Sequence, residues 1–386
     1  MKKTAVKIIF SLFFFSFFLI PRECFSESAI VTEAGGYYKN LLTFTKSIYT
    51  DEGIFADLSR LRVELQAQAK AWIFYAAVDN EFLVNDFANT ADFAFTRSQQ
   101  QQNLAFADLD KVSVDNDHLY ARHSLYRAYL KYYSPSLQLV IGKQSIDWGK
   151  MRFYSPVDLF NSLAPSALEP DERVGVDALN LNLAGSDFSG INIVVSPGTD
   201  SGEASFGVKL YNKMATYDCS LIAASIKKDI AVGVALDGYA KDAGLRAEIT
   251  HNRHDNGRDF ARIAVGVDYN FPNKLYILFE QFYNGGFEDN DASAFSSSYD
   301  KSRRILSLKK HLSNLYLSYE LTPLLKLSNM FTYDWEGKSV FLAPLIKYNI
   351  VENCDISAGL ELFYGRANSE FGDYKHLYYF ELKRYF

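Results

Sequence analysis

Side chains that could catalyse a reaction or bind a metal are few in this sequence, and they do not form a recognisable motif. The sequence contains six histidines, and the closest pair, His251 and His254, follows a stretch of alternating apolar residues. Because no cysteine or further histidine accompanies this pair, we interpret it as part of a solvated loop and not as a metal site. There is no Gly-x-Ser-x-Gly elbow for a serine nucleophile and no Cys-x-x-Cys-His motif for a covalently bound haem. We therefore predict no catalytic residue, no metal site and no cofactor.

Charged side chains recur instead at every second position of many short stretches. The clearest stretch is 57–69, in which Arg60, Arg62 and Glu64 alternate with apolar residues. Successive side chains of a β-strand point to opposite faces, so this pattern predicts a strand with one charged and one apolar face. We count about eighteen such strands between turn residues, with sixteen as the alternative count.

The number of strands decides between a soluble sheet and a membrane barrel. Eighteen strands are too many for an ordinary sandwich, and the repeat of about 40–50 residues that a propeller would show is not found. A chain without a second long apolar run can still cross a membrane if its apolar surface lies on alternate residues of a closed sheet. The fold class that we predict is all-β, a transmembrane antiparallel β-barrel of residues 27–386 with long extracellular loops.

The first 26 residues have the features of a secretory signal peptide. Lysines precede an apolar run, Ile8–Ile20, which is too short to span a bilayer as a helix. Cleavage is expected after Ser26, and Ser28 is nearly as suitable. The sequence has a formal net charge of −6, and the signal segment holds more basic than acidic residues, so the mature chain is more acidic. This balance argues against a nucleic-acid partner, which would require a basic surface.

The last strand indicates how the barrel is inserted and oriented. Its aromatic and apolar side chains Phe380, Leu382 and Phe386 share one face, and Arg384 interrupts that face. This arrangement resembles the closing strand of bacterial outer-membrane barrels, which carries the signal for the insertion machinery. The predicted partners are therefore outer-membrane lipid and that machinery, and the predicted location is the bacterial outer membrane.

Three long connections are expected on the extracellular side, at 84–117, 148–172 and 285–302. Such barrels have short periplasmic turns and longer outer loops. Because the last strand ends in the periplasm, counting strands back from it shows which connections are extracellular. All three loops lie outside only if Arg304–Leu321 is a single strand. The count is even only if Gly36–Lys46 is also a strand, since an odd count would force a parallel closure.

A resemblance to the alginate-export-like group of outer-membrane porins rests on motifs in the middle of the chain. These motifs are Ile141-Gly142-Lys143-Gln144, Asp147-Trp148-Gly149, the stretches Tyr154–Asn161 and Asp171–Leu179, and a further segment at Leu321–Leu325. They cover about a seventh of the chain. The resemblance implies an eighteen-stranded, porin-like, monomeric channel, and it does not imply alginate as the solute.

Alternation also predicts which charged side chains line the pore. The main candidates are Arg60, Arg62, Glu64, Arg127, Lys131, Lys209, Arg246, Glu248, Arg262 and Glu280. Basic residues outnumber acidic ones on the expected inner faces, which favours anions if those residues are not already paired. The alternative is that the charges pair across strands and fill the barrel as a salt-bridge network.

The loop 148–172 is the candidate constriction of the pore. It is rich in proline and aromatic residues, unlike the polar loop 84–117. A stiff apolar loop is expected to pack against another protein surface. The residues expected to carry this role are Trp148, Phe153, Tyr154, Asp158 and Phe160. The alternative is that the loop caps the rim or packs on a neighbour.

The predicted function is a channel for small or oligomeric polar solutes, with a weak bias toward anions. One alternative is a barrel that serves as a sheath or scaffold for an export or electron-transfer partner. A second alternative is an outer-membrane barrel hydrolase, which the scattered histidines do not favour. The sequence does not identify the solute.

Overall fold

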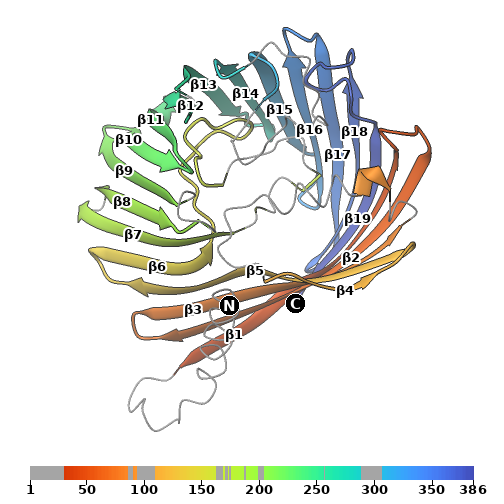
Figure 1. Cartoon of the computed structure of the whole chain (residues 1–386), viewed down its shortest axis with the longest axis horizontal. Coiled ribbons are helices and arrows are strands. Elements are labelled where there is room, and N and C mark those ends of the chain that lie inside the picture. The colour runs from red at the N-terminus through yellow and green to blue at the C-terminus, as the bar shows by residue number, and fades with distance from the viewer. Residues whose placement is uncertain are drawn as a thin grey trace.

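The chain forms a single large β-barrel in the computed structural model (Figure 1). The structure describes residues 30–85, 90–93, 109–161, 168–169, 173, 175–186, 188–198, 204–255, 257–287 and 307–386. The predicted signal peptide lies outside these residues. The strands are β1 (Val31–Lys46), β2 (Gly53–Ala69), β3 (Trp72–Asn85), β4 (Lys111–Asp115), β5 (Leu119–Tyr133), β6 (Leu137–Gln144), β7 (Val176–Ser186), β8 (Ser189–Ser196), β9 (Ser205–Met214), β10 (Tyr217–Ile226), β11 (Asp229–Ala240), β12 (Ala243–Arg253), β13 (Asp259–Asn270), β14 (Leu275–Asn284), β15 (His311–Glu320), β16 (Leu325–Asp334), β17 (Ser339–Val351), β18 (Cys354–Tyr364) and β19 (Leu377–Tyr385).

Eighteen of these strands close the barrel, and the short β4 is an addition to it. Each wall strand pairs antiparallel with its neighbour along the chain, and β1 pairs with β19 from Tyr37↔Tyr385 to Phe44↔Tyr378. β3 pairs directly with β5, so β4 lies outside the ring and pairs with β5. The predicted antiparallel barrel of eighteen strands is confirmed, and the alternative count of sixteen is wrong.

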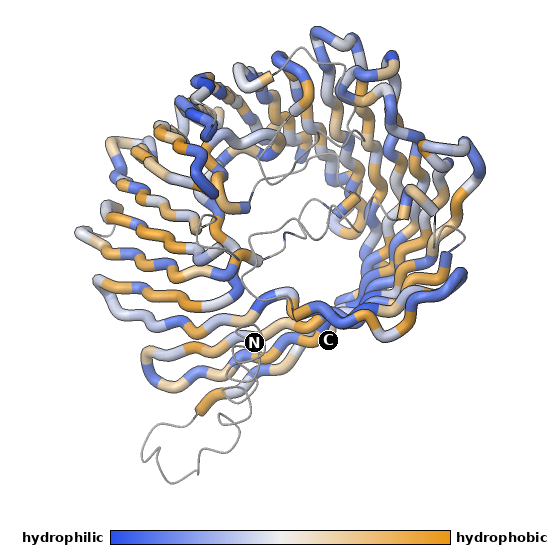
Figure 2. Tube along the Cα trace, viewed as in Figure 1, coloured by the Kyte–Doolittle hydropathy of each residue, from blue (hydrophilic) through white to orange (hydrophobic). Residues whose placement is uncertain are grey.

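The barrel forms because each strand has one polar and one apolar face. On β12 and β13, Ile249 and Val265 are 50% and 46% exposed, whereas Glu248 and Ala264 are 0% and 1% exposed. The exposed apolar residues lie on the outer surface, and the buried ones point into the barrel. Hydrophobic and hydrophilic residues alternate along the strands all around the ring (Figure 2). A closed sheet of this kind pairs its backbone groups internally and leaves an apolar outer band.

The two predicted strands on which the strand count depended are both present. Gly36–Lys46 is the larger part of β1, which begins earlier, at Val31, where it pairs with Gln68 of β2. The range Arg304–Leu321 contains one strand, β15, which begins at His311; residues 304–306 lie outside the described part of the chain. An even ring of strands results, so the three long connections all leave from the same end of the barrel.

Some boundaries differ from the prediction because short or bulged elements carry little periodic signal. β4 occupies part of the tract predicted as the loop 84–117, and β3 extends to Asn85. A bulge in β5 opposite Ala77 and Val78 places Tyr126 inside the barrel, under the guanidinium of Arg62 at 3.5 Å from the ring centroid. Strict alternation along β5 would place Tyr126 on the opposite face from Arg127, but the bulge shifts the alternation by one residue.

In the part of the chain that the structure describes, no helix is both long and apolar enough to cross a membrane.

Candidate functional site

The charged side chains predicted to line a pore all lie on inner faces of wall strands. Their positions follow from the strand register, in which residues directly opposite one another share a face. Arg60, Arg62 and Glu64 of β2 face Glu81, Asp79 and Ala77 of β3. The remaining candidates on the inner face are Arg127 and Lys131 of β5, Lys209 of β9, Arg246 and Glu248 of β12, Arg262 of β13 and Glu280 of β14.

On β2, β3 and β5 the inner face is a network of buried ion pairs. The Nε of Arg60 donates to Glu81 at 2.8 Å, and Arg122 donates to the other oxygen of that carboxylate at 2.6 Å. Arg62 makes a bidentate pair with Asp79 at 2.6 and 2.7 Å. These arginines are therefore already paired with carboxylates, as the salt-bridge alternative expects, and this wall offers less positive charge than its composition suggests.

On the opposite wall, the charged side chains of β12, β13 and β14 have more varied partners. Arg246 of β12 lies between Asp237, at 3.3 Å, and Asp268, with which it forms a short ion pair. Arg262 donates to the side-chain oxygen of Asn284 at 3.1 Å. Glu248 and Glu280 have a different role, because their carboxylates bind backbone groups of another segment.

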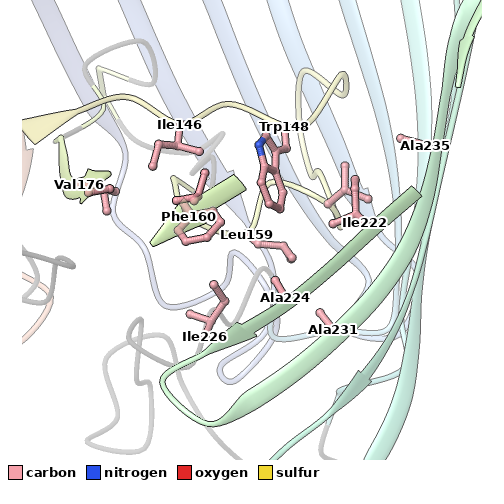
Figure 3. Close-up of a cluster of buried hydrophobic side chains, with 13 residues drawn as sticks. Ile146, Trp148, Leu159, Phe160, Val176, Ile222, Ala224, Ile226, Ala231 and Ala235 are labelled. Atoms are coloured by element: carbon pink, nitrogen blue, oxygen red, sulfur yellow. The ribbon is translucent and has the colours of Figure 1, made fainter. Parts of the chain in front are cut away.

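That segment is the inner segment, Ile146–Asn161, which follows β6 and runs along the inside of the wall. Trp148 and Phe160 contact each other edge to face at 5.2 Å between ring centroids. They pack with small and branched side chains of β7, β8, β10 and β11 in one buried cluster (Figure 3), whose further members are Ile146, Val157, Leu159, Val176, Ala178, Val194, Ile222, Ala224, Ile226, Ala231 and Ala235. A glycine, Gly207, makes room on β9, because a Cβ there would lie 2.6 Å from the Trp148 ring.

The middle of the inner segment packs against the next strands of the wall. Phe153 is 0% exposed, and Tyr154 stacks on Phe282 with ring centroids 5.0 Å apart. Both belong to a second buried cluster with Leu278 and Leu312, residues of β14 and β15. Aromatic side chains of the inner segment thus attach it to the wall from β7 to β15, and this burial opposes its movement into solvent.

Glu248 binds four donors of the inner segment through one carboxylate. One oxygen accepts from the backbone N–H of Lys150 at 2.6 Å and of Met151 at 3.3 Å. The other oxygen accepts from the hydroxyl of Ser155 at 2.6 Å and from the N–H of Val157 at 3.4 Å. The inner segment is neither strand nor helix, so its backbone N–H groups have no regular hydrogen-bond partners. The Glu248 carboxylate supplies the acceptors that water would otherwise provide.

Glu280 binds the two backbone groups that lie between those donors. Its two oxygens accept from the N–H of Arg152 at 2.8 Å and of Phe153 at 3.0 Å. Gly266 lies between the two glutamate strands, and a Cβ there would lie 3.1 Å from the Glu280 side chain. The guanidinium of Arg152 lies over the ring of Tyr316 at 3.9 Å, and Arg152 is exposed inside the barrel.

Arg173 joins the two ends of the inner segment. Its guanidinium donates to Asp147 at 2.7 Å, to Asp158 at 2.8 Å and to the carbonyl of Asn161 at 3.2 Å. Burial raises the pKa of the Asp158 carboxyl to about 7, although the positive charge of Arg173 acts in the opposite direction. Asn161 in turn accepts from the N–H of Ile146 at 2.9 Å. The segment is therefore closed into a compact loop.

The connection that contains the inner segment also contacts the far side of the barrel. Glu169 makes a bidentate pair with Arg60 of β2 at 2.9 and 3.1 Å and a short ion pair with Lys39 of β1. β2 and β12 are nine places apart in the ring of eighteen strands, so they lie opposite each other. One connection, bound to Glu248 on β12 and to Arg60 on β2, therefore reaches both walls of the lumen.

A polar cavity of about 390 Å³ lies beside the closure of the ring. It is lined by Tyr37, Arg62, Glu64, Arg127 and Lys383 among others. The Tyr37 ring is flanked by the Arg62 guanidinium at 5.0 Å and the Lys383 ammonium at 4.0 Å. The cavity is a polar space between described residues of β1, β2, β3, β5 and β19.

The residues predicted as an insertion signal lie at this closure. The register places Phe380 opposite Leu42 and Leu382 opposite Asn40 of β1. Phe386 exchanges two backbone hydrogen bonds with Gly36, each 3.1 Å long. Arg384 lies on the same face as Tyr38, which is the outer face.

The side chains that could bind a metal lie apart in the described residues. Within them no group of three or more histidine, cysteine, aspartate or glutamate side chains is placed to hold a metal ion. His251 lies within 3.5 Å of Asp259, and His254 within 2.9 Å of Asp229, each at the rim of a different strand pair.

Several residues of the site were not found from the sequence. Glu169 and Arg173 fall in a stretch without periodicity, and nothing in their spacing indicates their partners. Lys39 lies in a strand whose alternation is weak. Lys150 and Arg152 are adjacent to the predicted aromatic residues, and their charge inside a barrel was the signal that could have identified them.

The sequence matches no family model and no curated protein. Solved structures with a similar fold are nevertheless numerous. Acinetobacter baumannii OccAB3 aligns with a TM-score of 0.57 at 10% identity over 92% of this chain and 99% of its own. Pseudomonas aeruginosa OccK8 (OprE) aligns with a TM-score of 0.57 at 8% identity, and the outer membrane protein opdK of that organism with 0.55 at 8%, each over 92% of this chain and 98% of its own. At these identities the similarity establishes the fold alone: the chain has the porin-like β-barrel fold.

Proposed function

We propose that this protein is an outer-membrane channel for small polar solutes, and that the inner segment is its constriction. The observation that carries the proposal is a segment held against the inner wall by Glu248 and Glu280 inside a closed ring of eighteen strands. Its connection also reaches the opposite wall through Glu169. A segment in this position narrows a lumen, and the polar cavity lies at the closure of the ring. The fold similarity to the outer membrane protein opdK supports the location in the outer membrane.

The charge of the constriction favours anions, and we propose Lys150 and Arg152 as its main determinants. Both belong to the inner segment and are at least partly exposed inside the barrel. Arg60 and Arg62 of the wall are buried and paired with carboxylates. The exposed Lys150 lies 4.0 Å from Asp237, and the Arg152 guanidinium lies over the Tyr316 ring, so these two cations, and Arg152 foremost, contribute the positive charge that acts on selectivity.

The experiment is to incorporate the purified chain into planar bilayers and to measure single-channel conductance and reversal potential in a salt gradient. A conducting, weakly anion-selective pore is expected, and Arg152→Ala should shift the reversal potential toward cation selectivity. Lys46→Ala is a matched control, because Lys46 is exposed at the end of β1 and pairs with Asp51. A folded barrel that carries no current would overturn the channel, and equal reversal potentials for both variants would overturn the selectivity assignment.

A further inference from the structure

A second connection, residues 365–376 between β18 and β19, also folds into the barrel. Phe371 is 2% exposed, and its ring lies 5.7 Å from that of Phe341 and 6.4 Å from that of Phe363. Both partners are on inner faces, because the exposed Ile346 of β17 and Tyr364 of β18 occupy the alternate, outer positions. This β18–β19 loop therefore lies on the inner wall at the end from which the long connections leave.

Glu370 attaches the β18–β19 loop to two other segments. Its carboxyl group accepts hydrogen bonds from the N–H of Leu308 at 2.7 Å and the hydroxyl of Ser307 at 3.1 Å, just before β15. Its own N–H donates to Asp334 at the end of β16, at 3.1 Å. Asp334 is 0% exposed and also accepts from the hydroxyl of Ser339 at 2.8 Å. Two carboxyl groups are thus buried at one contact between three segments.

The two lysines that follow Leu308 are directed to other partners. The Lys309 ammonium lies over the ring of Phe287 at 5.4 Å, and the Lys310 ammonium over the ring of Tyr283 at 5.5 Å. Within the β18–β19 loop itself, Lys375 pairs with Asp51 at 2.9 Å and the Asp373 carboxylate accepts from the N–H of Asn368, while the His376 ring contacts Tyr364. Among the residues that the structure describes, the charge that acts on Glu370 is that of Asp334, which has the same sign.

Burial, reinforced by the charge of Asp334, raises the pKa of the Glu370 carboxyl to about 8. The docked loop thus holds a neutral Glu370 at neutral pH. An ionised Glu370 would be a buried charge next to a second carboxylate, and such a charge strongly destabilises its site.

We propose that the β18–β19 loop is a proton-controlled gate, which stays docked in the mouth of the barrel while Glu370 is protonated and leaves it when Glu370 ionises. This inference rests on the proposed channel function for its effect on current, and on the contacts of Glu370 for its mechanism.

The gate lies next to the constriction. Met330 on the inner face of β16 packs against the cluster that contains Phe153 and Tyr154 and also against the cluster that contains Phe371. Release of the loop therefore removes packing from a side chain that also supports the inner segment, so both should loosen together.

The direction of the pH dependence follows from linkage. The docked state binds the Glu370 proton more tightly than the released state, where the carboxyl regains its ordinary pKa of 4.5. Docking is therefore fully favoured below that value, and the ratio of docked to released loops falls about tenfold per pH unit as the pH rises toward about 8. Above that pH the ratio no longer changes.

The test combines current with a chemical readout of the loop in the full-length chain. Single-channel open probability is measured from pH 5 to 9.5 for the wild type, Glu370→Gln and the control Glu336→Gln, which changes a carboxylate on the neighbouring β16–β17 turn. In parallel, Ser369→Cys in a background without native cysteines is labelled with a thiol reagent, because Ser369 is 3% exposed in the docked loop. The rate is normalised to Tyr49→Cys, an exposed position.

Open probability and normalised labelling should both rise with pH and level off above about 8 in the wild type and in Glu336→Gln. Both should be independent of pH in Glu370→Gln. A response that persists in Glu370→Gln, or labelling that does not change with pH in the wild type, would overturn the gate. A pH-dependent labelling without any current at any pH would support the proton-controlled docking and overturn the channel function.

Discussion

Removal of the Glu248 carboxylate should detach the inner segment while leaving the barrel intact. In Glu248→Ala, the N–H groups of Lys150, Met151 and Val157 and the hydroxyl of Ser155 lose their acceptor. The two bonds of 2.6 Å dominate, and a hydrogen bond to a charged acceptor contributes about 1.5–3 kcal/mol. The loss is then about 3–6 kcal/mol, so the detached fraction of the segment should increase by at least about a hundredfold.

Single-channel recording is the assay, with Glu64→Ala as the matched control. Glu64 is also a glutamate on an inner face, and it lines the polar cavity away from the inner segment. Glu248→Ala should show a larger mean conductance and additional open levels, whereas Glu64→Ala should lack these additional levels, as the wild type does. If folded Glu248→Ala channels, verified by heat-modifiable migration, conduct like Glu64→Ala, the argument that this carboxylate holds the segment is refuted.

Two further substitutions test the packing and the ion pairs. Arg62→Ala removes the bidentate partner of the buried Asp79 carboxylate and leaves it facing Arg60, whose Nε lies 3.9 Å away. The free energy of unfolding should fall by about 3–5 kcal/mol in urea titrations, and an unchanged midpoint would contradict a buried pair. Gly207→Ala places a Cβ against the Trp148 ring, which should weaken the docking of the inner segment by about 1–3 kcal/mol and change the Trp fluorescence. Gly53→Ala is the control, because a Cβ there has no atom within 4 Å and should leave the fluorescence unchanged. Equal spectra for both glycine variants would show that the ring can move aside freely.

The barrel was predictable from the sequence because its strands repeat one simple rule. Alternation assigned Glu248 and Glu280 to an inner face without any knowledge of their partners. The requirement that all three long connections leave from one end predicted a single strand in Arg304–Leu321, where the structure has β15. Such long-range constraints compensate for the weak signal of each strand.

The partners of those side chains could not be predicted. The donors to Glu248 are backbone groups of an irregular segment, and the sequence does not encode where such groups point. Strict alternation misplaces Tyr126 because a bulge inserts one residue without a marker. The inward position of Phe371 in the β18–β19 loop depends on a contact with Phe341, which lies thirty residues away in the sequence.

The most direct test of the central claim is deletion of Met151–Leu168 followed by single-channel recording in planar bilayers. The deletion joins Lys150 directly to Glu169, and folding is checked by heat-modifiable migration. If the inner segment narrows a conducting lumen, the deletion variant should show a clearly larger single-channel conductance than the wild type. A folded deletion variant whose conductance equals that of the wild type would contradict the account.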